Sequence, residues 1–245
     1  MTSPSDVIVV GAGVIGCAVA YELARRGASV QIIDTRPVGM GATQASAGVL
    51  APFIEAREEG PLLELTAHSL ELFDDFITEV SARSGCPVQY HRTGTLDVAM
   101  TSESMSRLAV ACEFLARRGL KAELLDRTAV REREPNLSTE VVGGLFVATH
   151  GFTAASELTH ALAAAAGRFG ARLTDDTVRR ISQSGGEVRI DTKHARLTAD
   201  AVVVAAGSWA GQIEIEGAHS LPVRPVRGQL LQLNWPGREL SHVTW

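Results

Sequence analysis

Residues 6–16, with the sequence DVIVVGAGVIG, decide the fold. The four apolar residues from Val7 to Val10 are typical of a parallel strand that is buried on both faces. Apolar side chains then recur at helical spacing from Val14 to Arg26, and Gly27 suits the position just after a helix. A second buried strand is expected at Ser29–Asp34. This order of strand, glycine turn, helix and strand predicts a dinucleotide-binding βαβ unit.

The pattern Gly11-x-Gly13-x-x-Gly16 gives each glycine a physical task. Gly11 allows a tight turn, Gly13 has no Cβ to keep a pyrophosphate away, and Gly16 lets the helix pack closely on the strand. The helix N terminus offers unpaired N–H groups to phosphate oxygens. Asp34, at the end of the next strand, can accept hydrogen bonds from ribose hydroxyls, and its charge disfavours the 2′-phosphate of NADP. The alternative is a glycine turn without a ligand.

The composition is that of a globular protein. The chain has 245 residues, 45% hydrophobic and 21% charged, with a net charge of −5. Lys and Arg are not clustered, so no nucleic-acid surface is expected. The cysteines at 17, 86 and 112 match no metal spacing, which predicts no metal site and favours reduced thiols in the cytoplasm. Glycines interrupt the first apolar stretch, so we expect neither a signal peptide nor a membrane span.

Further elements follow from periodicity and turn residues. Ser156 is the expected N-cap of one helix, and the charge run from Arg131 to Glu134 is expected on a solvated helix face. The seven histidines are scattered, and each is expected on the surface or on a helix face rather than as a catalytic base. Helices are predicted at 62–83, 102–118 and 156–169. One long strand or a strand pair is expected at 88–100, and further strands are predicted at 144–148, 171–174, 177–182, 187–192 and 201–205.

Small residues dominate residues 39–52, whose sequence is GMGATQASAGVLAP. A mobile loop would explain them, and so would a backbone that passes close to a large flat ring system. Here the chain resembles the D-amino-acid oxidase and glycine oxidase family of FAD-dependent oxidoreductases. The matching residues are Gly41-Ala42-Thr43 and the run from Ser46 to Pro52, followed by Glu55-Ala56.

The resemblance extends along the chain. Arg92–Leu96, Glu134–Leu137, Val202–Trp209 and Leu221–Gln229 are similar to successive family motifs, and the nearest likeness is to the glycine oxidases of thiamine biosynthesis. The stretch from His150 to Ala154 departs from the family, which often has Val-Asp-Pro-Arg there, and this weakens a glycine-specific reading.

The strand–helix–strand start and the later meander predict an α/β fold. We expect a Rossmann-like, doubly wound FAD-binding domain at 1–85 and 145–215. An interleaved antiparallel α+β substrate domain is expected at 86–144 and 216–245. The resemblance implies that family members continue well beyond a segment like 241–245. The substrate domain is therefore expected to be incomplete and the chain to be a fragment of a longer oxidase.

The resemblance implies FAD as the cofactor, held by two glycine-rich turns and by the residues that follow the second strand. The residues expected to contact it are Gly11, Gly13, Val14, Ile15, Gly16, Asp34, Thr35, Arg36, Ala42, Thr43, Ser46, Ala47, Gly48, Leu50, Val178, Ala206, Gly207 and Trp209.

The reaction implied is hydride transfer from a carbon next to an amine to flavin N5, with reoxidation by oxygen. The substrate would be a small amine or amino acid, glycine- or sarcosine-like, and the flavin itself carries the chemistry. A substrate carboxylate needs a cation, and Arg92, Arg224 and Arg227 are the candidates. The alternative for each arginine is to anchor neighbouring backbone.

Other functions stay open at this point. One is a flavin dehydrogenase of the same family with an electron acceptor other than oxygen. A second is an NAD-dependent dehydrogenase, and a third is a non-catalytic FAD-binding fragment or subunit. The sequence also leaves a homo-oligomer open.

Overall fold

The computed structural model describes residues 5–55, 59–219 and 221–245. The chain forms two compact units and enters each more than once. The first unit contains Met1–Ser46, Ile77–Gln89 and Ala154–Leu230, and the second contains Ala47–Phe76, Tyr90–Thr153 and Leu231–Trp245. These compact units differ from the predicted functional domains mainly at Ala47–Phe76, a segment that belongs to the second unit. In that unit, strand Val49–Leu50 pairs with strand Gly151–Thr153. The functional domains at 1–85 with 145–215, and at 86–144 with 216–245, stay a prediction.

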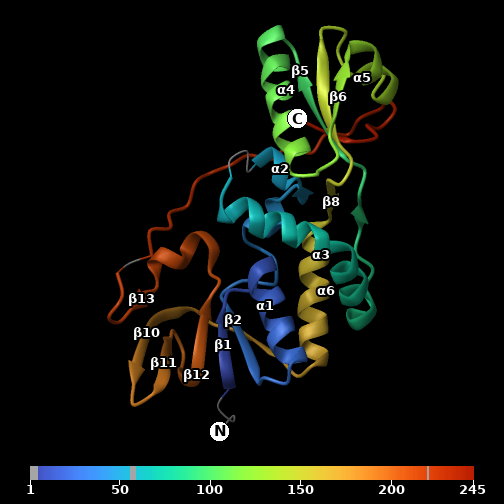
Figure 1. The fold of residues 1–245 in the computed structure, drawn as a ribbon. Coiled ribbons are helices and arrows are strands. Elements are labelled where there is room, and N and C mark those ends of the chain that lie inside the picture. Colours follow the sequence, from blue (N-terminus) through green and yellow to red (C-terminus); the bar gives the residue numbers. More distant parts are fainter. Residues whose placement is uncertain (1–4, 56–58, 220) are drawn as a thin grey trace. The chain divides into compact units, whose positions relative to one another are not determined.

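A seven-stranded sheet organises the first unit, in the order β13-β10-β11-β12-β1-β2-β9 (Figure 1). Strand β1 pairs in parallel with β2 and β12, and β2 pairs in parallel with β9. Strands β10, β11 and β12 form an antiparallel meander. The bounds are β1 Ser5–Val10, β2 Val30–Asp34, β9 Arg172–Asp175, β10 Val178–Ser184, β11 Glu187–Thr192, β12 Arg196–Val204 and β13 Glu214–Ile215.

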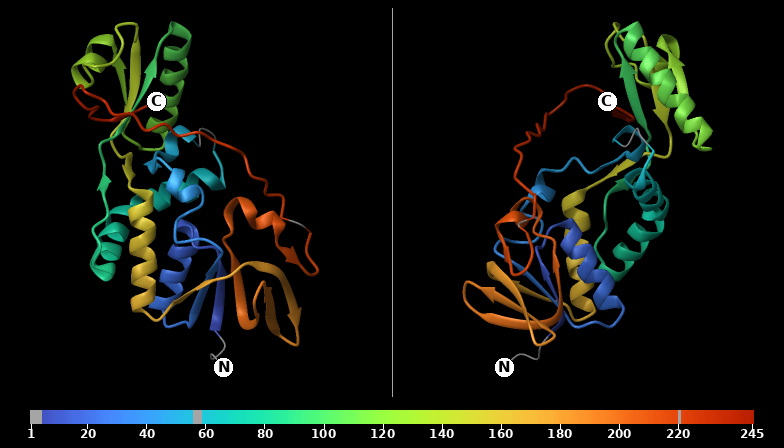
Figure 2. Two further views of the ribbon diagram at one scale, coloured as in Figure 1. Left: turned by 180° about the vertical axis from the view of Figure 1, so that it is seen from behind. Right: turned by 60° about the vertical axis from the view of Figure 1, so that its left-hand side comes forward.

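Two helices, α1 (Val14–Arg25) and α6 (Ala155–Arg168), lie on the same side of β1 and β2 (Figure 2). They pack against each other, and both carry small buried residues, such as Ala20 and Ala161, which allow helix axes to approach closely. Short 3-10 helices η1 (Ala42–Ala45) and η2 (Gly207–Gln212) complete this unit together with the end of α3 (Pro61–Ser84).

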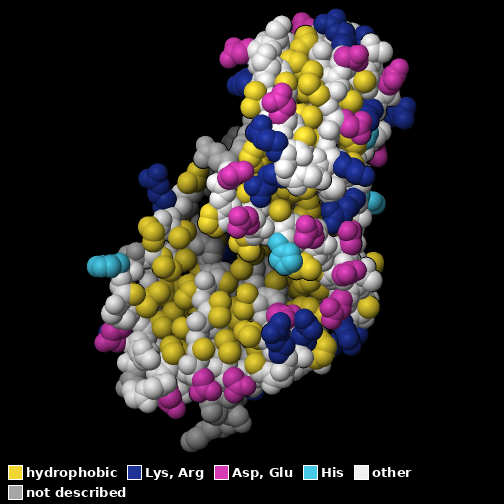
Figure 3. All heavy atoms as spheres, viewed as in Figure 1, with side chains coloured by type: hydrophobic (Ala, Val, Ile, Leu, Met, Phe, Trp, Pro, Cys, Tyr) yellow, Lys and Arg dark blue, Asp and Glu magenta, His cyan; other side chains and the backbone are white. Residues whose placement is uncertain are grey.

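A separate apolar core joins β1 and β2 to the meander. Ile8, Ile33, Ile181 and Ile190 are buried in it. Apolar side chains also gather on the surface over β10 to β12 (Figure 3), where Leu197 and other residues of this cluster are only partly buried. The meander is thus held to the parallel strands by hydrophobic burial as well as by the ladder of hydrogen bonds.

The second unit has two small sheets. One has the order β14-β5-β7-β6 and the other the order β3-β8-β4. Leucines from α3 and α4, such as Leu63 and Leu108, pack with Leu145 in its core. The bounds are β3 Val49–Leu50, α2 Pro52–Glu55, β4 Tyr90–His91, β5 Thr95–Ala99, α4 Ser102–Arg117, β6 Glu123–Asp126, α5 Arg127–Arg133, β7 Gly143–Val147, β8 Gly151–Thr153 and β14 Val243–Thr244.

The α/β fold and the predicted helices are confirmed. Of the two possibilities at 88–100, one long strand or two strands, the structure has two, β4 and β5, in different sheets. Three other local expectations are corrected. Helix α6 has Ala154 rather than Ser156 as N-cap, with no side-chain cap. Glu134 and His150 are buried, at 1% and 0% exposure, whereas a solvated face and a surface position were expected.

Candidate dinucleotide-binding site

Two glycines at the turn after β1 are required because neighbouring backbone atoms leave no room for a side chain. Gly11 has a φ of +113°, and a Cβ there would lie 2.3 Å from the Ala205 carbonyl oxygen. A Cβ on Gly16 would lie 1.9 Å from the Gly11 carbonyl oxygen, so the first turn of α1 packs closely on the glycine turn itself. Among the residues that the structure describes, Thr43 Oγ1 at 3.5 Å is the one atom within 4 Å of a Cβ on Gly13. The space beside Gly13 is therefore open, as a cradle for a ligand requires.

The N terminus of α1 suits an anion. Its N-cap is Gly13, which has no capping side chain, and its first turn holds no acidic residue. Val14 N donates a hydrogen bond of 3.2 Å to Thr43 Oγ1, so η1 is tied to the start of the helix. Positive potential from the helix dipole and N–H groups thus faces the space beside Gly13.

Asp34 stands at the carboxyl end of β2 and is held by two backbone amides. Ala12 N donates to Oδ2 at 2.7 Å, and Arg36 N donates to Oδ1 at 2.9 Å. A carboxylate oxygen can accept about two hydrogen bonds, and the described residues supply one to each oxygen of Asp34, so each oxygen can accept another. This carboxylate can therefore receive two hydroxyl groups in a fixed geometry.

Two adjoining cavities lie along this edge of the sheet. The larger has a volume of about 480 Å³ and runs between β2, the start of β10 and η2. The smaller, of about 200 Å³, lies over the N terminus of α1 and beside η1. The two cavities share five lining residues and therefore adjoin: Gly11, Asp34, Arg36, Ala206 and Trp209.

Arg36 and Trp209 stack where the two cavities meet. The guanidinium carbon of Arg36 lies 4.0 Å from the centroid of the Trp209 ring, in cation–π geometry. Trp209 is 40% exposed, so this pair forms a solvent-facing part of the site.

Most of the sequence-predicted residues come together here. The linings of these two cavities do not include Gly16, Ser46, Ala47, Gly48 or Leu50. The predicted residues that line a cavity are Gly11, Gly13, Val14, Ile15, Asp34, Thr35, Arg36, Ala42, Thr43, Val178, Ala206, Gly207 and Trp209.

The structure gives a reason for glycine at position 48 that the sequence did not indicate. Its φ is +69°, and a Cβ there would lie 1.8 Å from the Thr153 carbonyl oxygen. The close approach that requires glycine is therefore to β8 within the second unit. Leu50, also in this unit, lines a separate cavity of about 250 Å³ with Leu70 and Phe73. Ser46 is the C-cap of η1 in the first unit.

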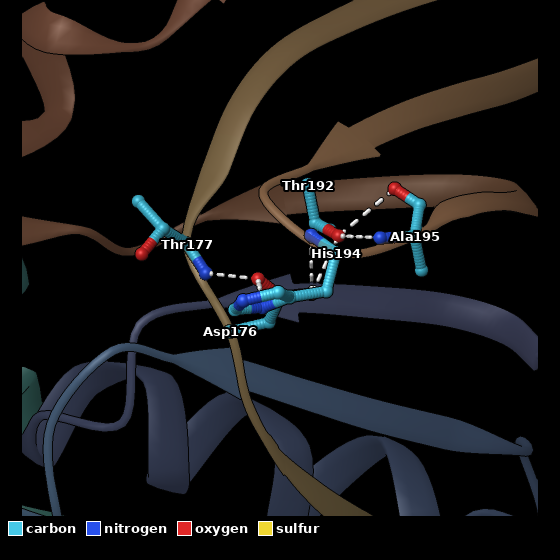
Figure 4. A network of polar contacts seen from close by, with 5 residues as sticks. All are labelled: Asp176, Thr177, Thr192, His194 and Ala195. Atoms are coloured by element: carbon cyan, nitrogen blue, oxygen red, sulfur yellow. Dashed lines mark hydrogen bonds and ion pairs between the residues drawn. The ribbon is translucent and has the colours of Figure 1, made fainter.

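Sequence reasoning missed the turn between β9 and β10. Asp176, Thr177 and Arg179 line the larger cavity beside Val178. Asp176 is 7% exposed and takes part in a network of hydrogen bonds (Figure 4). A polar run between two predicted strands was the available signal, because such turns at the carboxyl ends of parallel strands line ligand sites.

The three candidate arginines differ in their surroundings. Arg92, in the second unit, donates to both carboxylate oxygens of Asp74 and to the carbonyl oxygens of Thr149 and Leu70. These bonds give its guanidinium an anchoring task. Arg224 and Arg227 are exposed, in a stretch of the first unit without helix or strand.

Two further properties concern the described part of the chain only. Within residues 5–55, 59–219 and 221–245, no three or more His, Cys, Asp or Glu side chains are grouped so that they could hold a metal ion. Among the helices described there, none combines the length and the apolar character needed to cross a bilayer.

A glycine turn at the end of a parallel strand, a carboxylate on the next strand and two adjoining cavities define a dinucleotide-binding α/β protein. The family model described as FAD dependent oxidoreductase matches residues 6–245. The chain belongs to this family, whose cofactor is FAD.

Individual relatives agree in sequence and in structure. Glycine oxidase of Geobacillus kaustophilus is 34% identical over 241 residues, covering 96% of this chain and 63% of that protein. The bifunctional protein ThiO/ThiG of Synechocystis is 29% identical over 239 residues, covering 96% of this chain and 34% of that protein. The crystal structure of the Geobacillus kaustophilus glycine oxidase superposes with a TM-score of 0.84 at 32% identity, covering 86% of this chain and 58% of the other. The chain thus spans less than two thirds of the length of these relatives.

Proposed function

We propose that the chain binds FAD along the two adjoining cavities of the first unit. The observation that carries this proposal is the open space beside Gly13, which continues past Asp34 into the larger cavity. Asp34 would accept hydrogen bonds from the adenosine ribose, and Thr35, Arg36 and Val178 would enclose the adenosine. The pyrophosphate would face the N terminus of α1, between Gly13 and Thr43 on one side and Ala206 and Gly207 on the other.

The segment from Ser46 to Leu50 stays in the proposal as a contact of the flavin half. Its support is the resemblance of this segment to the family motif, together with the fixed backbone at Gly48. The two predicted functional domains, at 1–85 with 145–215 and at 86–144 with 216–245, belong to the same proposal.

We further propose that the protein oxidises a small amine or amino acid, glycine- or sarcosine-like. FAD supplies the chemistry when bound, because its ring accepts a hydride from a carbon next to an amine. The residues of this chain bind and orient the cofactor. Arg224 and Arg227 are the better candidates for a substrate carboxylate, since Arg92 is already engaged by Asp74 and two carbonyl oxygens.

Oxygen is the proposed electron acceptor, because the relatives named above include glycine oxidase. A different acceptor and a non-catalytic flavin-binding subunit are the rival functions. We also propose a cytoplasmic location, since Cys17, Cys86 and Cys112 are all unpaired. Size-exclusion chromatography would test for a homo-oligomer.

One experiment separates these functions. The purified chain, supplied with FAD and freed of excess, is expected to show bound-flavin absorption. Glycine or sarcosine under nitrogen should then bleach it, and air should restore the colour and yield peroxide. Bleaching without peroxide would indicate another acceptor, and colour without bleaching a non-catalytic subunit. A colourless protein that takes up no FAD would disprove the proposal.

A further inference from the structure

The turn between β9 and β10 holds a buried carboxylate that the proposed binding site does not explain. Asp176 Oδ1 accepts hydrogen bonds from Thr177 N at 2.7 Å and from His194 Nδ1 at 3.1 Å. Its Oδ2 accepts from Thr192 Oγ1 at 2.6 Å and from His194 N at 3.4 Å. Figure 4 shows these donors converging on Asp176 from its own turn, from Thr192 at the end of β11 and from His194 in the connection that follows.

Asp176 and Asp34 differ in the number of hydrogen bonds that each carboxylate accepts from the protein. A carboxylate offers about four acceptor sites, two on each oxygen. Asp176 has four donors from the protein, two at each oxygen, whereas Asp34 has two, one at each oxygen. Both oxygens of Asp176 are therefore engaged by the protein, which indicates that this carboxylate holds the turn rather than a ligand.

That task is to fix one wall of the larger cavity. Thr177, Val178 and Arg179 form this wall immediately after Asp176. Two backbone bonds hold the same turn, from Asp176 N to the Asp34 carbonyl oxygen at 3.1 Å and from Lys193 N to the Thr177 carbonyl oxygen at 2.8 Å. The carboxylate thus joins the wall to the β11–β12 connection at the point where β2 ends.

We propose that Asp176, through Thr192 and His194, is a positioning residue that holds the 177–179 wall in shape for the adenosine half of the cofactor. This inference rests on the proposed binding of FAD. If the wall is ordered before the ligand binds, binding does not carry the entropic cost of ordering the wall. The affinity for the ligand therefore depends on Asp176 although the ligand does not contact this residue.

The charge of Asp176 persists over the working pH range. Burial raises the pKa of this carboxyl, but the hydrogen bonds from Thr192, Thr177 and His194 outweigh burial and lower the pKa to about 2. Replacing the carboxylate by a neutral amide is therefore a change of charge and of donor pattern at any pH used for binding.

The test compares Asp176→Asn with Asp175→Asn. Asparagine keeps the shape but turns an NH₂ group toward two donors, whereas Asp175 is exposed and loses the same charge one residue away. Calorimetry with FAD and with ADP should show roughly tenfold weaker binding of both ligands to the Asp176→Asn protein and unchanged binding to the control. Thr192→Val removes one donor to Asp176 together with the acceptor of Ala195 N, and it should weaken the binding of both ligands by roughly threefold.

Hydrogen exchange on the free protein supplies a readout that needs no ligand. The amides of residues 177–179 should exchange faster in Asp176→Asn and Thr192→Val than in the control. If Asp176→Asn does not fold, the exchange rates and ligand affinities of Thr192→Val alone test the inference. Unchanged exchange and affinity would overturn the inference, and so would weaker FAD binding with unchanged ADP binding. If the wild type binds no FAD, the proposed function fails, while the exchange experiment still tests the wall.

Discussion

At the scale of single residues, the glycines of the first turn have separable tasks. Gly11 and Gly16 are required by neighbouring backbone, since a Cβ on either would overlap a carbonyl oxygen. Gly13 has no such neighbour in the described part of the chain, so the folded protein has room for a methyl group there. Residues needed for folding can therefore be told apart from a residue needed for the ligand.

Gly13→Ala is expected to leave the free protein stable and to weaken FAD binding by more than about tenfold, because the methyl group would occupy the space of the pyrophosphate. Thermal unfolding without FAD and calorimetry with FAD would measure the two effects.

Gly16→Ala is the contrasting variant. Alanine suits a helix better by about 1 kcal/mol, yet a contact of 1.9 Å to the Gly11 carbonyl oxygen should lower the melting temperature. Normal FAD affinity in Gly13→Ala would contradict the assignment of the cradle.

At the scale of elements, one carboxylate joins α5 to β14. Glu134, the C-cap of α5, accepts hydrogen bonds at Oε1 from Ser241 N, His242 N and His242 Nδ1, at 2.7, 2.7 and 2.6 Å. These bonds hold the chain just before β14 pairs with β5. A charged acceptor with three donors is worth more than a neutral one, by about 1–2 kcal/mol.

Glu134→Gln should therefore loosen β14 without unfolding the second unit. The amides of Val243 and Trp245, which donate to the Gly94 and Leu96 carbonyl oxygens, are expected to exchange about tenfold faster. Glu132→Gln is the matched control, since Glu132 lies in the same charge run but is exposed. Equal exchange in the two variants would show that Glu134 does not hold the strand.

These elements also show how far sequence reasoning reaches. The first βαβ unit was predictable because its signals, from Val7 to Asp34, are local: apolar runs, helical spacing and glycines at fixed positions. Glu134 was assigned to a solvated face because its partners lie 107 and 108 residues away and leave no mark on the local charge pattern. Asp176 was missed for a related reason, since it is tied to Thr192 and His194 across two strands. Long-range polar networks need the fold before they can be seen.

At the scale of the whole molecule, stability should depend on pH through His150. This side chain is fully buried in the second unit, stacks on Phe53 with ring centroids 5.2 Å apart, and has Nδ1 at 2.7 Å from Thr95 Oγ1. Burial, and then the positive charge of Arg92, lower the pKa of its imidazole to about 4. The folded state thus holds a neutral histidine at a pH where an unfolded chain would protonate it.

The sign of the effect follows from the two pKa values. An unfolded histidine has a pKa of about 6.5, so between about pH 6.5 and pH 4 the unfolded chain binds more protons than the folded one. The contribution of His150 to stability is therefore complete above about pH 6.5 and is lost as the pH falls toward 4. Since each pKa unit corresponds to about 1.4 kcal/mol, the loss should be on the order of 2–3 kcal/mol.

His150→Asn would remove this titration while keeping a polar group near Thr95. Urea unfolding from pH 7 to pH 4.5 should show the wild type losing stability more steeply than His150→Asn, although the variant starts lower because its smaller side chain leaves a cavity beside Phe53. His68→Asn is the control, because the His68 side chain is 69% exposed and its variant should follow the wild-type slope. Parallel curves for wild type and His150→Asn would mean that the buried imidazole is not what makes the folded chain sensitive to acid.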